Sequence, residues 1–178
     1  MIKKAILMFL AMTSCAFADH HQEDQVNEFV TKIASDVVAL VKSKQTDDIT
    51  EKELTNIFQN VMDIDWMAKF AIGKKWLQLN ADEKSTYLSN YKNYLTTLYV
   101  PTFKKYNGQK LNIKDVKPLG NGYYIVTTTI YAEGTSAPFK VEYRVKDMEG
   151  AYKVRDIVAE GISLINTCLL YTSPSPRD

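Results

Sequence analysis

Apolar residues follow a helical period through the first half of the chain. Val26 and Val30 begin a series at steps of three and four residues, which predicts an amphipathic helix over residues 22–44. Thr50 and Glu53 have the spacing of a capping box, in which each side chain satisfies a free backbone N–H of the first turn. We therefore expect a second helix to begin at Thr50.

Two further helices complete the first half. Residues 63–72 predict a short helix, and Gly73 is a suitable residue to end it. Residues 80–83 repeat the capping spacing and open the longest predicted helix, which should kink at Pro101 because proline lacks an N–H and its ring clashes with the preceding turn. We expect this helix to end at residues 107–108, an Asn-Gly pair.

After residue 108 the apolar period changes from 3.6 to 2, which is typical of strands. Short Gly-containing turns separate the strands and indicate antiparallel hairpins. In the third strand Val141 and Tyr143 alternate with Glu142 and Arg144, so one face packs on the helices and the other meets water. The fold class is therefore α+β, with N-terminal helices on one face of a curved antiparallel sheet whose four strands are predicted at residues 111–116, 123–131, 139–145 and 152–158.

Both ends of the chain differ from its middle. Residues 1–18 combine Lys3 and Lys4, an apolar run and an Ala-Phe-Ala site, which predicts a secretory signal peptide cleaved after Ala18. A lipoprotein box ending at Cys15 is a weaker interpretation of the same segment. Residues 168–178 resemble the translation of a sequencing-library adapter, so we assign the domain to residues 19–167.

Composition excludes several classes of protein. The 178 residues are 46% hydrophobic and carry a formal charge of +1, so no broad basic surface indicates a nucleic-acid partner. Removal of Lys3 and Lys4 with the signal changes this charge from +1 to −1. Both cysteines, Cys15 and Cys168, lie outside residues 19–167, so the predicted domain has no disulfide and no thiolate site. We expect no cofactor and no metal, and a monomer.

Asp156 is the polar residue that most suggests catalysis. Strict alternation places it on the inward face with Tyr152 and Val154, where burial would raise its pKa and make it a general base. The alternative function is then a small α+β cone enzyme of the isomerase type, with Tyr143 or Tyr152 as the oxyanion donor. A structural interpretation is a carboxylate satisfied by Arg144 or a backbone N–H, or a strand whose phase shifts at a bulge.

Large apolar side chains are unusually abundant on the short third helix, the long helix and the sheet. Such a set is a solid core in one interpretation, which would fit a periplasmic adaptor without ligand. In the other, helices and sheet separate to leave an apolar cavity with hydroxyl groups at its mouth. The residues that we predict to line this cavity are Trp66, Phe70, Leu88, Tyr91, Leu95, Leu98, Tyr99, Phe103, Val126, Thr128, Ile130, Phe139, Val141, Tyr143, Val145, Val158 and Ile162.

Two motifs resemble a known family. Residues 60–76 read NVMDIDWMAKFAIGKKW, which resembles the D-x-x-x-M-A-x-x-x-L-G-x-x-W region of the MlaC, or toluene-tolerance, periplasmic proteins. Residues 141–145 and 152–164 read VEYRV and YKVRDIVAEGISL, similar to that family's V-x-Y-R and W-K-V-Y-D-V-x-x-E-G-V-S-L stretches. Ile72 and Arg155 depart from the pattern, where the family often has Leu and Tyr.

The resemblance implies a periplasmic phospholipid carrier. Such a carrier would exchange lipid with an inner-membrane ABC transporter complex and an outer-membrane lipoprotein complex, and so maintain the asymmetry of the outer membrane. The apolar cavity would then hold the acyl chains of bound phospholipid, its cargo. The family continues after these motifs into a helical region that closes the fold, and we expect that region to be missing here, where the adapter-like residues 168–178 begin.

Overall fold

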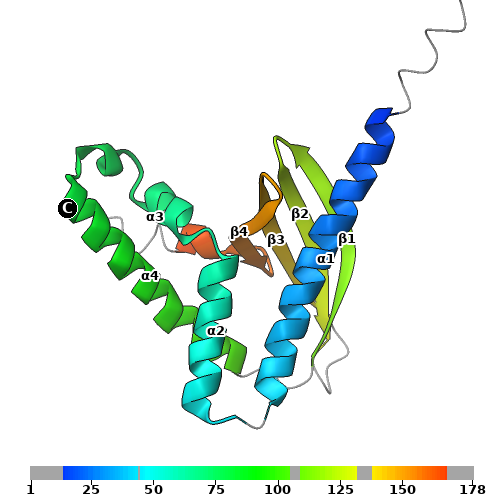
Figure 1. Ribbon diagram of the computed structural model, residues 1–178, viewed down its shortest axis with the longest axis horizontal. Coiled ribbons are helices and arrows are strands. Elements are labelled where there is room, and N and C mark those ends of the chain that lie inside the picture. The colour runs from blue at the N-terminus through cyan, green and yellow to red at the C-terminus, as the bar shows by residue number, and fades with distance from the viewer. Residues whose placement is uncertain (1–13, 44, 105–108, 132–137, 168–178) are drawn as a thin grey trace, which may run out of the picture.

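The computed structural model describes residues 14–43, 45–104, 109–131 and 138–167 (Figure 1). Helices form the first half and strands the second, as the sequence predicts. The helices are α1 (Ser14–Lys42), α2 (Asp47–Val61), α3 (Ile64–Ile72), the 3₁₀ helix η1 (Gly73–Gln78) and α4 (Ala81–Lys104). The strands are β1 (Lys110–Gly120), β2 (Tyr123–Tyr131), β3 (Phe139–Met148), β4 (Ala151–Ala159) and β5 (Ile162–Ser163).

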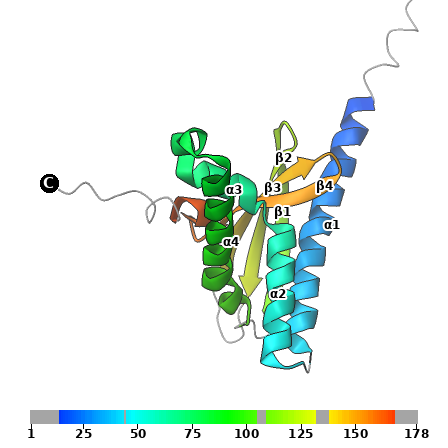
Figure 2. The same ribbon diagram turned by 60° about the vertical axis from the view of Figure 1, so that its left-hand side comes forward.

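The helices pack in two groups. α1 lies along β1 and β2, whereas α4 packs mainly on α2 and α3 (Figures 1 and 2). α2 contacts α1, and α3 contacts β4, so these two helices connect the groups. The α+β fold is confirmed, but the long helix rests on other helices and not directly across the sheet.

The sheet is an antiparallel meander in the order β1-β2-β3-β4-β5. The first four strands are those that the sequence predicts, and the two-residue β5 is an addition. Val126 lies opposite Tyr143, and Thr128 lies opposite Val141, so these four side chains share one face. Val126 and Val141 are buried and Arg144 is exposed, which confirms the alternation predicted for β3.

A register shift in β4 changes which face its side chains occupy. Val154 pairs with Val145, but Asp156 pairs with Arg144, so Arg155 is an extra residue in β4. Asp156 therefore points to the face of Arg144, opposite to Val154. The strict alternation that we expected across Asp156 is wrong, and the bulge that we considered as an alternative is present.

One of the two predicted capping boxes forms. The Asn80 N–H donates to Glu83 Oε2 at 2.8 Å, and the Glu83 N–H donates to Asn80 Oδ1 at 2.9 Å, which confirms the start of α4. The box at Thr50 is wrong, because α2 begins at Asp47 and the Thr50 N–H already donates to the Thr46 carbonyl. Gly73 ends α3 with a φ of 60°, a conformation that glycine adopts without strain.

The core joins all the layers. Its buried members come from α1, α2, α3, α4 and the inner sheet face, and residues after β5 also contribute. They include Val26, Val30, Met67, Leu95, Val126, Val145, Val154, Leu164 and Ile165.

The predicted ends of the chain lie largely outside the described residues. Residues 1–13 and 168–178 are not described, so the signal peptide and the adapter-derived tail stay predictions, as does the helix end at 107–108. α1 begins at Ser14, earlier than the predicted start at residue 22. Within the described ranges, no helix is both long and apolar enough to cross a membrane.

Candidate functional site

Thr128 and Tyr143 place hydroxyl groups on the inner face of the sheet, next to Val126 and Val141. Thr128 is fully buried on β2, and its hydroxyl donates to the Val141 carbonyl at 2.9 Å. Burial raises the pKa of Tyr143 to about 12, and a hydrogen bond with Thr128 partly offsets this effect. Tyr143 therefore stays protonated at neutral pH. It supplies a neutral hydroxyl among aliphatic side chains, which suits hydrogen bonding more than proton abstraction.

The predicted cavity residues differ in exposure. Those near the middle of the sheet and of α4 are buried, whereas those at the ends of the elements reach solvent. Buried members are Tyr91, Leu95, Val126, Thr128, Val141, Val145 and Val158; half-buried members are Trp66, Leu88, Tyr99, Phe103, Ile130 and Tyr143; exposed members are Phe70, Leu98, Phe139 and Ile162. Their role in lipid binding stays a prediction.

The structure brings some of these residues together on α2 and α4. The Phe58 ring lies 6.5 Å from the Tyr99 ring and 6.2 Å from the Phe103 ring. Phe58 is buried, and it was not among the predicted residues. Its position one helical turn after Leu54, within an apolar stripe, was the available signal.

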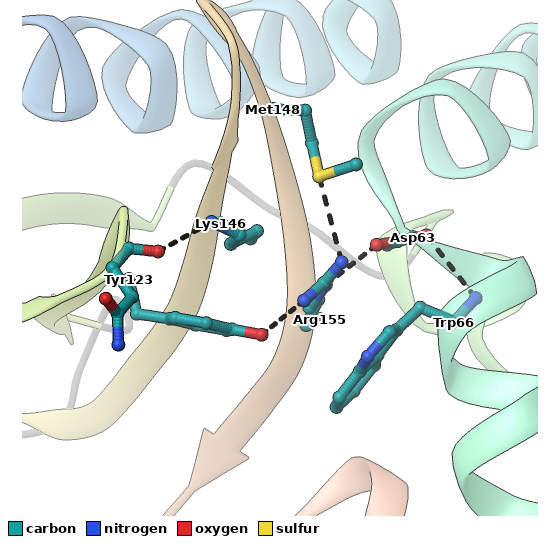
Figure 3. Close-up of polar contacts among 7 residues, drawn as sticks. Asp63, Trp66, Tyr123, Lys146, Met148 and Arg155 are labelled. Carbon is teal, nitrogen blue, oxygen red and sulfur yellow. Dashed lines mark hydrogen bonds and ion pairs between the residues drawn. The ribbon is translucent and has the colours of Figure 1, made fainter.

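Trp66 packs against the main core, and its ring also links Phe70 to Arg155. The Trp66 and Phe70 rings stack at 5.1 Å, and the Arg155 guanidinium lies 4.6 Å from the Trp66 ring. Arg155 also donates to the Tyr123 hydroxyl, and its Nε donates to Asp63 Oδ2 at 2.8 Å (Figure 3). These contacts of Arg155 join the start of α3 to β2 and β4.

Asp156 has structural partners that account for its burial. Its side chain is 3% exposed, accepts from the Ser163 hydroxyl at 2.7 Å and from the Ile165 N–H at 3.1 Å, and lies 3.4 Å from Arg144 Nη1. The Ser163 hydroxyl in turn accepts from the Asn166 N–H. Asp156 thus holds the helical turn that begins after β5. Both proposed oxyanion donors have other partners: Tyr143 hydrogen-bonds Thr128, and the Tyr152 hydroxyl donates to Gln25.

A surface hollow of about 430 Å³ lies elsewhere, between η1 and α4. None of the predicted cavity residues lines it. Its walls are Ile72, Leu79, Asp82, Glu83, Thr86, Tyr87 and Asn90. In the part of the chain that the structure describes, no group of three or more His, Cys, Asp or Glu side chains is placed to hold a metal.

Similar proteins agree on one family. A curated relative from Haemophilus influenzae, the intermembrane phospholipid transport system binding protein MlaC, is 21% identical over 164 residues, which cover 90% of this chain and 77% of the relative. Among solved structures, the phospholipid-binding protein from Ralstonia solanacearum, in complex with a phospholipid, has a TM-score of 0.67 and 20% identity. The likeness covers 80% of this chain and 82% of that chain, and it shows a shared fold.

The family model described as MlaC protein matches residues 27–168. This range includes the second part of α1 and all of α2, α3, η1, α4 and the five strands. The chain belongs to the MlaC protein family.

Proposed function

We propose that this protein is a periplasmic phospholipid carrier that holds acyl chains between its helices and the inner face of its sheet. The observation that carries the proposal is the match to the MlaC family over most of the chain, together with a structural neighbour that was solved with a phospholipid. The inner sheet face has suitable chemistry, because the buried Val126, Val141 and Val145 lie close to the hydroxyl groups of Thr128 and Tyr143.

Physical chemistry explains why such a carrier is needed. Burying an acyl chain returns about 0.8 kcal/mol per CH₂, so a two-chain lipid leaves a bilayer for water very slowly. A protein that covers the chains with apolar side chains removes this barrier. Chain burial does not distinguish head groups, so we expect weak head-group selectivity. Release requires a partner that binds an open conformation of the carrier better than the closed one. A partner with equal affinity for both conformations would not change their populations.

The partners follow from the same proposal. The carrier would receive and deliver phospholipid at an inner-membrane ABC transporter complex and an outer-membrane lipoprotein complex, and it would act as a monomer without a cofactor. Export by the predicted signal peptide, with cleavage after Ala18, would place it in the periplasm.

The direct test is the lipid content of the protein. The full chain, expressed with its own signal and purified from the periplasm, should yield phospholipid on extraction and mass spectrometry. It should also take up phospholipid from vesicles. A protein that is folded by circular dichroism but carries no phospholipid and takes up none would contradict the proposal.

A pair of substitutions on one strand tests the position of the site. Val141 is buried on the inner face of β3, and its neighbour Lys140 is exposed on the outer face. Val141→Trp should reduce phospholipid uptake, whereas Lys140→Trp should leave it unchanged. If both variants keep their far-UV spectra and bind lipid equally, the acyl chains lie somewhere else.

A further inference from the structure

The corner between α3 and α4 combines a strongly exposed leucine with a cluster of lysines. Leu77, on η1, is 83% exposed. Trp76 beside it is half-buried, and the ammonium groups of Lys69 and Lys84 each lie 5.5 Å from its ring. We call this segment, residues 69–84, the η1 corner; it lies at the end of the molecule away from α1 and the sheet (Figures 1 and 2).

The charge of the η1 corner differs from that of the whole chain. It contains four lysines, including the exposed Lys74 and Lys75, against Asp82 and Glu83, and so carries +2 within 16 residues, whereas all 178 residues carry +1. The Glu83 carboxylate accepts from the Asn80 N–H and keeps its charge. The four lysines still outnumber the two carboxylates, so the η1 corner presents a net positive charge to an approaching surface.

The two apolar side chains have different positions relative to these charges. Leu77 projects into solvent, whereas Trp76 is half-buried. The Trp76 ring lies 5.5 Å from both the Lys69 and the Lys84 ammonium groups, and 6.4 Å from the Tyr87 ring. Tryptophan is favoured at the boundary between lipid head groups and acyl chains, and lysines there meet the phosphates of anionic lipids. The arrangement therefore matches the layers of a bilayer surface: an inserted leucine, a tryptophan at the boundary, and ammonium groups at the phosphates.

We propose that the η1 corner is a peripheral membrane-docking site, in which Leu77 inserts into an anionic phospholipid surface and Lys69, Lys74, Lys75 and Lys84 bind its phosphates. A protein partner fits less well, because a stable protein interface needs about 800 Å² from each side, and the exposed large apolar side chains of the η1 corner are Leu77 and the less exposed Phe70. Each lysine near an anionic surface adds to the affinity, and salt screens the contribution, so binding should be reversible and salt-dependent. The inference does not depend on the proposed cargo of the fold.

The test is sedimentation of the full chain with vesicles. Vesicles of phosphatidylcholine with phosphatidylglycerol should bind the protein, and vesicles of phosphatidylcholine alone should bind it much more weakly. Leu77→Ser and the double variant Lys74→Glu/Lys75→Glu should each reduce binding to the anionic vesicles by about tenfold. The matched controls are Leu119→Ser, at a side chain that is 54% exposed on β1, and Lys114→Glu/Lys117→Glu on the same strand. These controls should bind within about twofold of the unaltered protein, since the contribution of a charge falls off within a Debye length of the surface.

Tryptophan fluorescence gives a second, local measurement. The chain has two tryptophans, so Trp66→Phe leaves Trp76 as the only source of tryptophan fluorescence. Anionic vesicles whose acyl chains carry bromine should quench this emission, and added salt should restore it. Equal binding to both kinds of vesicle, equal losses in corner and control variants, or an unquenched Trp76 would each overturn the proposal. A protein that carries phospholipid but ignores anionic vesicles would overturn this inference alone and leave the carrier function in place.

Discussion

The guanidinium of Arg155 forms an ion pair with Asp63, with 2.8 Å between Nε and Oδ2, and both side chains are largely buried, at 11% and 16% exposure. Asp63 is also the N-cap of α3, where its Oδ1 accepts from the Trp66 N–H. One carboxylate thus caps a helix and binds the extra residue of the β4 bulge. The ion pair fixes how the helical group meets the sheet.

Loss of Arg155 should therefore destabilise the protein. Arg155→Met keeps much of the apolar stem, removes the charge and leaves Asp63 without its cation, so we expect the free energy of unfolding to fall by about 2–3 kcal/mol. Denaturation in urea measures this. Asp63→Asn is the matched change, since asparagine still caps the helix. If the double variant equals the sum of the single variants to within about 0.5 kcal/mol, the two residues are not coupled.

Asp156 should behave as a structural residue. Asp156→Ala leaves the Ser163 hydroxyl and the Ile165 N–H without their acceptor, so we expect a loss of about 2–4 kcal/mol in unfolding free energy. Ser163→Ala removes only the hydroxyl and should cost about 1 kcal/mol. Hydrogen exchange at the Ile165 amide should accelerate in both variants. Asp156→Asn should still bind phospholipid, and a protein that folds normally but loses binding would contradict a purely structural role.

Tyr143 should make stability fall at high pH. Its pKa is about 12 in the folded protein against 10.0 for an ordinary tyrosine, because burial disfavours the phenolate. The contribution of Tyr143 to the free energy of unfolding is fully present below pH 10, where the hydroxyl is protonated in both the folded and the unfolded protein. It is lost as the pH rises through 12, because the unfolded state releases its proton first.

The size of this effect is on the order of 2 kcal/mol for a shift of this kind. Comparison of the unaltered protein with Tyr143→Phe isolates it, both in phenolate absorbance and in unfolding free energy between pH 10 and 12. Tyr152, whose pKa is raised first by burial, is present in both proteins and cancels. Identical pH dependence of the two proteins would show that the Tyr143 hydroxyl is accessible to water.

Alternation and capping chemistry made much of the fold predictable. β2 has the predicted bounds, 123–131, because every second side chain in its first half packs inward and a turn that contains Gly122 precedes it. Gly73 ends α3 as expected, since a positive φ suits a residue without a side chain. These signals are local, so the sequence contains them in full.

Contacts between distant segments were not predictable in this way. Arg155 meets Asp63 across 92 positions, and the bulge at Arg155 reverses the face of Asp156. No local pattern marks such a bulge, because it depends on what packs beside β4. The contact between the Arg155 guanidinium and the Trp66 ring likewise joins distant segments, and no local pattern marks it. The assignment of Trp66 and Phe70 to the lipid cavity stays a prediction.

The two sequence-predicted capping boxes offer a matched pair of substitutions. Asn80→Ala removes the acceptor of the Glu83 N–H and weakens the reciprocal bond, so it should lower the free energy of unfolding by about 1 kcal/mol. Thr50→Ala should change it by less than about 0.5 kcal/mol, because Thr50 lies inside α2, where alanine is the better helix former. Urea denaturation of both variants decides the point. Equal losses would mean that the Thr50 hydroxyl stabilises α2 in a way that its position within the helix does not explain.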